Sequence, residues 1–374
     1  MSSGRSQVGP PDKINLKGSR ILDSTEVPSA QAVRLVIAML RDPPDLTPLA
    51  TPGSWDLVRE AAPLLGVTAL VAYAARPHFS STERAWCDQM LLQSWQRHDQ
   101  GLAELDSVLA ILDEAKIPAI SLKGPLLARR HYQPCFLRKA SNDIDVAVKS
   151  IDLERAYDAF VRAGYAPTTT IREARLRYHH LAMSHPSRRS VELHFRLSHQ
   201  CLGIPVDEFF DRAVQARTPS GRNTLILEPA DELMHLVLHF AQRHKGGYFL
   251  PTLHEIRHVW TSAPVACRRE AVRRAAAHHF AGAVAITDLA CSSTWGTPLL
   301  GPEIAAPRTW LHRWMNEKLY RDFERRATLP LTIRRTPAMK LWGRWLEFRL
   351  TDRPHDALRV IKVLLLALWF RGAQ

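Results

Sequence analysis

A run of six residues, 143–148 (DIDVAV), constrains the fold of this chain more than any other part of the sequence. It places two aspartates one residue apart at the start of a β-branched, apolar segment, which predicts a strand. Side chains at positions i and i+2 of a strand point to the same side, so Asp143 and Asp145 would project together. The apolar residues Ile144, Val146 and Val148 would face the core. Two carboxylates on one side repel each other unless a cation lies between them, and hard oxygen ligands suit Mg²⁺.

The residues that precede this strand suggest a phosphate group as the partner of that cation. Lys123 and Gly124 lie at a predicted strand-to-helix turn, where a helix N-terminus presents unpaired N–H groups. Gly124 allows close approach of the backbone to a phosphate, and Lys123 can neutralise it as a point charge. Arg138 could bind phosphate oxygens with its planar guanidinium, and Ser141 could bond a triphosphate or shape the turn.

Glu192 is the best candidate for a third carboxylate. It lies in a predicted strand over residues 190–197 and faces away from the apolar side of that strand. Two metal ions that clamp a phosphoryl transfer need shared carboxylates, and a strand beside 143–148 would bring Glu192 to the aspartates. By alternation His194 faces the same side, where it could orient a ligand or pair with Glu192.

These motifs together resemble the bacterial family of uncharacterised nucleotidyltransferases, in the DNA polymerase β nucleotidyltransferase superfamily. The matching residues are Lys123-Gly124, Arg138, Asp143-Ile144-Asp145, Gly164-Tyr165 and Glu192-Leu193-His194. The resemblance covers about residues 30–260. It implies a magnesium enzyme that binds an NTP, with ATP among the candidates, and transfers NMP to a hydroxyl or phosphate acceptor. It also implies a metal triad of Asp143, Asp145 and Glu192. The acceptor could be a small molecule, a peptide, a protein or RNA.

The predicted fold class is α+β: a small mixed β-sheet nucleotidyltransferase core with flanking helices and extra N- and C-terminal helical regions. We expect a disordered leader over residues 1–29, an N-terminal helical region over 30–116, the core over 117–228 and a C-terminal helical region over 229–374. Helices are expected at 31–40, 55–65, 68–75, 82–115, 126–132, 152–163, 230–244, 253–260, 268–279 and 304–325, and strands at 117–122, 143–148, 190–197 and 223–227.

Composition limits the cellular setting. The 374 residues carry a formal net charge of +13, which favours an anionic partner or simply an arginine-rich surface. The five cysteines form no CxxC pair, so a disulfide framework or a cysteine zinc cluster is not expected. The N-terminus lacks the apolar stretch of a signal peptide, and no apolar run reaches the length of a transmembrane helix. We therefore expect a cytoplasmic protein. The apolar C-terminal run 360–370 predicts a packed helix, with weak membrane-surface contact as the alternative.

Competing interpretations remain open at the level of sequence. His254-Glu255-Ile256-Arg257-His258 matches HExxH, the pattern of a zinc metalloprotease. Pro125 follows Gly124 and offers no N–H to a phosphate, which favours a catalytically weak module that binds RNA or a partner protein. A sugar-nucleotide glycosyltransferase also uses paired aspartates, but the helical pattern before them argues against that class.

Two further groups of histidines stand out. His235 and His239 lie four residues apart among apolar neighbours and predict a half-buried helix whose histidines are hydrogen-bonded. Tyr178-His179-His180 and His185 form a loose cluster for which the sequence suggests no role.

Overall fold

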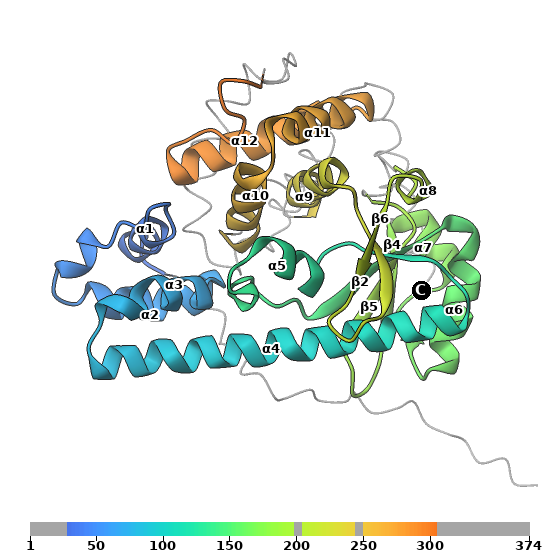
Figure 1. The fold of residues 1–374 in the computed structure, drawn as a ribbon, viewed down its shortest axis with the longest axis horizontal. Helices are drawn as coiled ribbons and strands as arrows, with labels where there is room; N and C mark the ends of the chain where they lie inside the picture. The colour runs from blue at the N-terminus through green and yellow to red at the C-terminus, as the bar shows by residue number, and fades with distance from the viewer. Residues whose placement is uncertain (1–27, 198–203, 244–249, 305–374) are drawn as a thin grey trace, which may run out of the picture.

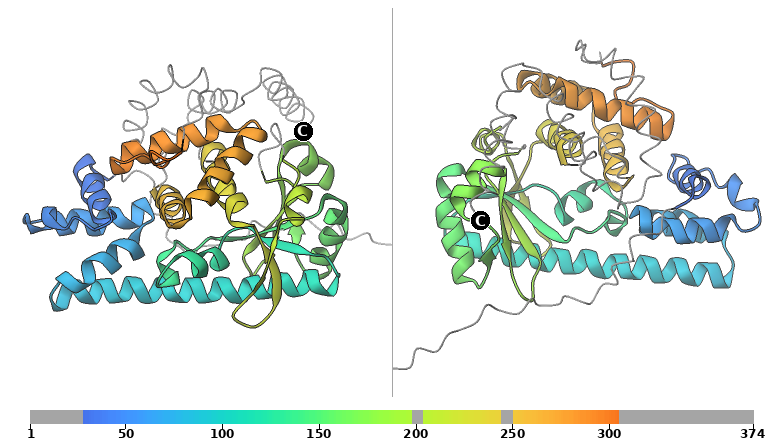
Figure 2. Two further views of the ribbon diagram at one scale, coloured as in Figure 1. Left: turned by 45° about the horizontal axis from the view of Figure 1, so that its top comes forward. Right: turned by 180° about the vertical axis from the view of Figure 1, so that it is seen from behind.

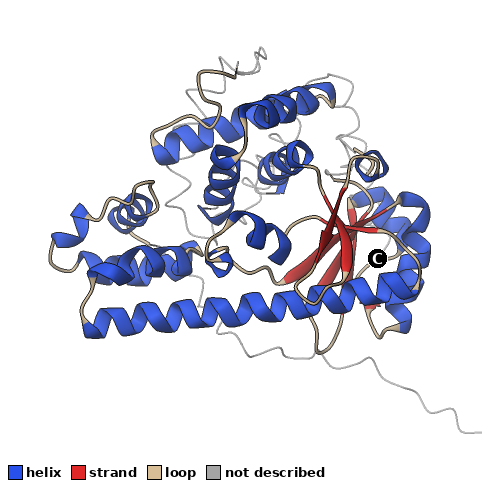
Figure 3. Cartoon of the chain, in the orientation of Figure 1, coloured by secondary structure: helices blue, strands red, loops and turns tan. Residues whose placement is uncertain are grey.

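The computed structural model describes residues 28–197, 204–243 and 250–304. Within them a seven-stranded mixed sheet lies between two groups of helices (Figures 1 and 3). The strand order is β3-β4-β5-β2-β1-β7-β6. The mixed sheet and the predominance of helix agree with the predicted α+β class.

The strands are short and come from the middle of the chain. They are β1 (Ala119–Ser121), β2 (Asp143–Val148), β3 (Ala166–Pro167), β4 (His180–Ser184), β5 (Ser190–His194), β6 (Val214–Arg217) and β7 (Asn223–Ile226). The helices are α1 (Ala30–Met39), α2 (Ser54–Leu65), α3 (Thr68–Ala75), α4 (Ser81–Glu114), α5 (Pro125–His131), α6 (Leu153–Arg162), α7 (Ile171–Arg177), α8 (Asp207–Phe210), α9 (Pro229–Arg243), α10 (Leu250–Ser262), α11 (Val265–Ala277) and α12 (Ala281–Trp295). Short 3₁₀ turns lie at Thr47–Ala50, Arg76–His78, Cys135–Leu137 and Ser150–Asp152.

Strand β2 lies in the middle of the sheet and carries the paired aspartates. It runs antiparallel to β1 and parallel to β5, in a register that places Asp145 opposite Glu192 and Ala147 opposite His194. Strand β4 runs antiparallel to β5, and its first residue, His180, pairs with His194. Because paired residues on neighbouring strands project to the same side, this register sets the composition of the site.

Each face of β2 packs into a different core. The buried side chains of Ile144, Val146 and Val148 join a cluster with α4 and α6, as the alternation of the strand predicts. On the opposite face, Ala147 belongs to a larger cluster that also contains buried residues of α1–α3 and α9–α12. The aspartates therefore project from the face that the C-terminal helices cover.

Helix α4 runs beneath the whole described structure (Figures 1 and 2). Its 34 residues span about 50 Å at 1.5 Å per residue. Near its start Cys87 is buried in the core shared with α1–α3, and near its end Leu105, Val108 and Leu112 pack beneath the sheet. The helix thus joins the N-terminal helices to the sheet.

Helix α9 is fixed by buried ion pairs. Asp231, which is fully buried, binds Arg212 at 2.8 Å and Arg274 at 2.7 Å. The neighbouring Glu232 contacts Arg130 and receives a 2.6 Å hydrogen bond from His131 of α5. These contacts attach the C-terminal helices to the turn region that precedes β2.

The observed helices match the predicted ones best where the helical periodicity extends over many residues. Several shorter elements were not predicted. The helices expected at 68–75 and 82–115 are α3 and α4, shifted by at most one residue. The sequence did not predict β3, β4, β6, α7, α8 or α12. The expected helix at 304–325 lies, after its first residue, outside the described residues, as do the C-terminal run 360–370 and most of the expected leader 1–29. Among the described helices, none has the length and apolar character needed to cross a membrane.

Candidate active site

Two of the predicted carboxylates meet at the centre of the sheet. The parallel register of β2 and β5 places Asp145 beside Glu192, and His194 follows two residues later on the same face. Ligand atoms of these three side chains all lie within 4.8 Å of one another. Only 4% of the Asp145 side chain and 16% of the Glu192 side chain are exposed. The structure therefore places acidic oxygens, largely shielded from water, next to one imidazole.

Two cationic groups compensate these carboxylates. Lys123 Nζ lies 3.3 Å from Asp145 Oδ1, and His194 Nε2 donates a 3.0 Å hydrogen bond to the same oxygen. His194 Nε2 also lies 3.4 Å from Glu192 Oε2. Lys123 comes from the turn after β1, and the sequence analysis assigned it to a phosphate. In this structure its ammonium group contacts a carboxylate.

The pKa directions are consistent with ionised carboxylates held by a charged imidazole. Burial alone would raise the pKa of Asp145, but the ammonium of Lys123 and the hydrogen bond from His194 outweigh it and hold that pKa well below its ordinary value. Burial is likewise outweighed at Glu192, whose pKa is lowered by the His194 hydrogen bond and charge. Burial would lower the pKa of His194, yet its two carboxylate partners raise it.

Asp143 lies at the edge of this cluster. It pairs in register with Ser190, two residues before the Asp145–Glu192 pair, and accepts a short hydrogen bond from the Ser141 hydroxyl. Burial raises the pKa of Asp143, and the negative charges of Asp145 and Glu192 raise it further. Neighbouring carboxylates repel each other, and a divalent cation that binds them relieves this repulsion. The donor set therefore fits a hard ion such as Mg²⁺.

A shallow depression that opens to solvent adjoins Asp143 through Ser141. It is lined by Arg97, His98, Gly101, Gly124, Pro125, Ala128, Arg138, Lys139, Ala140, Ser141 and Arg189. Gly124, Arg138 and Ser141 are three of the four residues that the sequence assigned to a phosphate, and the fourth, Lys123, does not line this pocket. Gly124 has a φ of +77°, a backbone conformation that suits glycine, and a side chain placed there would meet no atom within 4 Å. The pocket is strongly cationic and open at this turn.

Arg138 is held by an acidic partner from the C-terminal helices. Its Nε donates a 2.6 Å hydrogen bond to Glu255 Oε1, and its Nη2 donates a 3.2 Å hydrogen bond to Oε2. About a tenth of each side chain is exposed. Two of the guanidinium donors that the sequence assigned to phosphate oxygens are thus bound to a carboxylate from α10.

The same ion pair bears on the HExxH segment. Helix α10 carries His254, Glu255 and His258, but both oxygens of Glu255 bind Arg138, and His258 Nε2 donates a 2.6 Å hydrogen bond to the carbonyl of His131. Among the described residues, the groups with metal-ligand spacing include neither histidine of this segment. These contacts speak against the zinc protease alternative, because the carboxylate that would serve as general base is neutralised in an ion pair.

The chain matches the protein family described as uncharacterised nucleotidyltransferase over residues 51–295. It belongs to that family. The matched region contains β2, β5 and every residue of the candidate site. No curated protein and no solved structure matches the chain. Membership supports a nucleotidyltransferase-like domain and a transferase that uses an NTP.

Several residues near the site escaped the sequence analysis. Arg97 and Lys139 line the cationic pocket, and Arg189 closes it by donating hydrogen bonds to two backbone carbonyls, those of Ser141 and Arg97. His180 lies 3.5 Å from Glu192. Arginines are abundant in this chain, so no local pattern in the sequence distinguished Arg97 and Arg189 from the other surface arginines. The Tyr178-His179-His180 cluster was visible in the sequence, but the strand pairing that brings it to Glu192 was not.

His235 differs from the expectation of a hydrogen-bonded histidine. It is 1% exposed on α9, and neither ring nitrogen has a hydrogen-bond partner within the described part of the chain. Burial, reinforced by the positive charges of Lys123 and His194, lowers its pKa to about 3. The ring is therefore neutral in the folded protein, and it lies near the positive charges of Lys123 and His194.

We expect Glu255→Gln to destabilise the fold by about 3–5 kcal/mol, because it leaves the Arg138 guanidinium buried without a counter-charge. The double variant Arg138→Met/Glu255→Leu should lie within about 1.5 kcal/mol of wild type, because it removes both charges together. Denaturant unfolding measures both. Arg59→Gln is the control: it removes an exposed ion pair with Asp56, and we expect a change below about 1 kcal/mol. A double variant as unstable as Glu255→Gln would contradict the ion-pair account.

We expect acid to destabilise the protein through His235. The unfolded chain takes up a proton on this histidine near pH 6.5, whereas the folded pKa is about 3, so this contribution to stability is present above pH 6.5 and is lost as pH falls. His235→Leu removes it. The unfolding free energy of the variant minus that of wild type should therefore rise by up to about 1.4 kcal/mol for each pH unit below 6.5.

Chemical denaturation of the two proteins between pH 7.5 and pH 5 measures this difference. His78→Gln is the control, because His78 is exposed and stays in water in both states. A difference between His235→Leu and wild type that stays constant over this range would show that His235 is not held neutral.

Proposed function

We propose that this chain is a Mg²⁺-dependent nucleotidyltransferase with a DNA polymerase β-like core, which transfers NMP from an NTP to a hydroxyl or phosphate acceptor and releases pyrophosphate. The observation that carries the proposal is the register of β2 and β5, which sets Asp145 beside Glu192 with Asp143 two residues earlier on the same strand. The three carboxylates supply the hard oxygen ligands that Mg²⁺ prefers. Bound there, Mg²⁺ would neutralise the triphosphate and clamp the attacking and leaving oxygens.

In this proposal Asp143, Asp145 and Glu192 hold the metal, and Glu192 helps to deprotonate the acceptor. The cationic pocket beside Ser141 receives the triphosphate. Its positive side chains belong to Arg97, Arg138, Lys139 and Arg189. Pro125 cannot donate a backbone N–H to a phosphate, so these side chains carry more of the binding than the turn itself.

Lys123 connects the two parts of the proposed site. Its ammonium group lies 3.3 Å from Asp145, and its backbone neighbour Gly124 lines the cationic pocket. A positive charge at this point lowers the cost of bringing a triphosphate next to three carboxylates. Arg138, paired with Glu255, lines the pocket wall but adds little net charge to it.

We expect Asp145→Asn to lower nucleotidyl transfer by at least about a hundredfold while the fold is retained, because it removes a shared metal ligand. Incubation with each α-labelled NTP, Mg²⁺ and a cell extract reports transfer as label that enters an acceptor. Asp158→Asn, an exposed aspartate on α6, is the control and should keep wild-type transfer. Circular dichroism verifies folding. Undiminished labelling by Asp145→Asn would refute the assignment, and a wild-type protein that binds no NTP would favour a nucleic-acid or protein-binding module.

We expect Arg97→Gln to weaken NTP binding by about tenfold, equivalent to about 1.4 kcal/mol, because it removes one cation from the phosphate pocket. Arg97 is exposed, so the fold should not depend on it. Calorimetric titration with NTP and Mg²⁺ measures the affinity. Arg84→Gln, an exposed arginine on the same helix outside the pocket, is the matched control. Equal affinities for the two variants would place the triphosphate elsewhere.

A further inference from the structure

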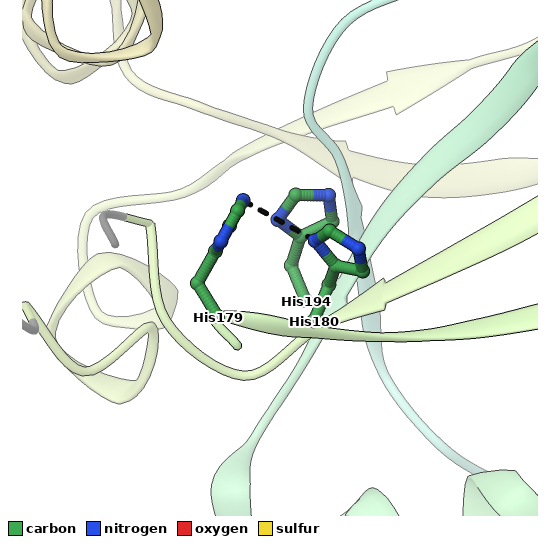
Figure 4. Close-up of side chains that lie close together, drawn as sticks. All are labelled: His179, His180 and His194. Atoms are coloured by element: carbon green, nitrogen blue, oxygen red, sulfur yellow. Dashed lines mark hydrogen bonds between the residues drawn. The ribbon is translucent and has the colours of Figure 1, made fainter. Parts of the chain in front are cut away.

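Three histidines gather on the flank of the carboxylate cluster. His179 directly precedes β4, His180 begins β4, and His194 ends β5. The antiparallel pairing of His180 with His194 brings the three rings together, with centroid separations of 4.5 Å for His179–His180 and 5.2 Å for each other pair. One potential ligand nitrogen from each ring lies within 4.8 Å of the others. Figure 4 shows the three rings side by side, where β4 begins and β5 ends.

The carboxylates fix which nitrogen of His194 and of His180 faces the other histidines. His194 Nε2 is bound to Asp145 at 3.0 Å, which leaves Nδ1 as the second ring nitrogen. That Nδ1 is buried and has no hydrogen-bond partner within the described residues, and the side chain is 2% exposed. His180 Nε2 lies 3.5 Å from Glu192 Oε1, so its Nδ1 is likewise the second nitrogen. Imidazoles that ligate metals commonly donate their other N–H to a carboxylate in this way.

The distance between two of these nitrogens matches a metal site. His180 Nδ1 lies 3.2 Å from His179 Nε2, the pair joined by the dashed line in Figure 4. Two nitrogens bound to a tetrahedral Zn²⁺ at about 2.0–2.1 Å lie about 3.3 Å apart. Only a small adjustment of the rings separates the observed pair from such a geometry.

We propose that this three-histidine cluster binds a divalent transition-metal ion of the zinc class through His179 Nε2 and the Nδ1 atoms of His180 and His194. Neutral imidazole nitrogens suit Zn²⁺ and Co²⁺, whereas Mg²⁺ prefers oxygen ligands. On metal binding the proton between His179 and His180 moves to Nδ1 of His179, and His194 releases the proton on its own Nδ1 to solvent while it keeps the proton on Nε2. Three protein ligands leave one tetrahedral position for water or another ligand.

This site is distinct from the proposed magnesium site, although His194 contacts both. Asp145 accepts the Nε2–H of His194, and Glu192 lies 3.5 Å from Nε2 of His180, so in this proposal the carboxylates face the outward nitrogens and do not bind the second ion. Loss of nucleotidyl transfer would not bear on the inference, because metal binding is measured without nucleotide.

The test titrates the full-length, chelator-treated protein with Co²⁺ in the presence of excess Mg²⁺, at mildly alkaline pH. We expect one equivalent to give the visible spectrum of tetrahedral Co²⁺, which Zn²⁺ then abolishes by displacement. His179→Gln and His180→Gln should each weaken Co²⁺ binding at least tenfold. His185→Gln, a nearby histidine outside the cluster, should bind Co²⁺ within twofold of wild type.

A second measurement does not depend on the folding of any variant. X-ray absorption of the wild-type protein with one equivalent of Zn²⁺ should show about three imidazole nitrogens around the metal. A wild-type protein with no tetrahedral Co²⁺ spectrum, or with only oxygen ligands around Zn²⁺, would overturn the inference. Binding that is lost in Asp143→Asn and retained in His179→Gln would also overturn it, because the ion would then occupy the carboxylate site.

Discussion

The parallel pairing of β2 with β5 is the constraint on which the site depends. It forces the carboxylates of Asp145 and Glu192 to the same side of neighbouring strands, on a face that is closed to most solvent. Two negative charges at strand separation, poorly screened by water, repel each other strongly. The fold offsets that repulsion with Lys123 and His194, which come from the adjoining strand ends. A buried arrangement of this kind persists only when cationic partners are part of it.

The C-terminal helices complete the site as well as covering it. Glu255 of α10 fixes Arg138 beside the cationic pocket, and Glu232 of α9 binds α5, which begins one residue after Gly124. The sheet face that carries the aspartates shares one apolar core with these helices and with α1–α3. The positions of Gly124 and Arg138 therefore depend on contacts between segments that are more than a hundred residues apart in sequence.

Two kinds of donor lie on the two sides of one histidine. On one side of His194 are carboxylate oxygens, which suit a hard ion. On the other are the nitrogens of His179 and His180, which suit a borderline ion. Because Asp145 accepts the Nε2–H of His194, and Glu192 lies 3.5 Å from Nε2 of His180, the oxygen cluster also directs the Nδ1 atoms of these two rings toward the nitrogen cluster. The two donor sets are thus chemically different but structurally coupled.

Elements with a strong local pattern could be predicted from the sequence. The alternation of 143–148 predicted which residues of β2 face the core, and long helical periodicity predicted α3 and α4 almost to the residue. It also identified Asp145, Glu192 and Lys123, which the structure brings together. The partners of these side chains became clear from the three-dimensional structure: Arg138 is bound to Glu255, His180 reaches Glu192, and His235 is buried with no hydrogen-bond partner among the described residues. Periodicity reports which face of an element is apolar, but strand order and register, which choose a side chain's neighbours, arise from packing between distant segments.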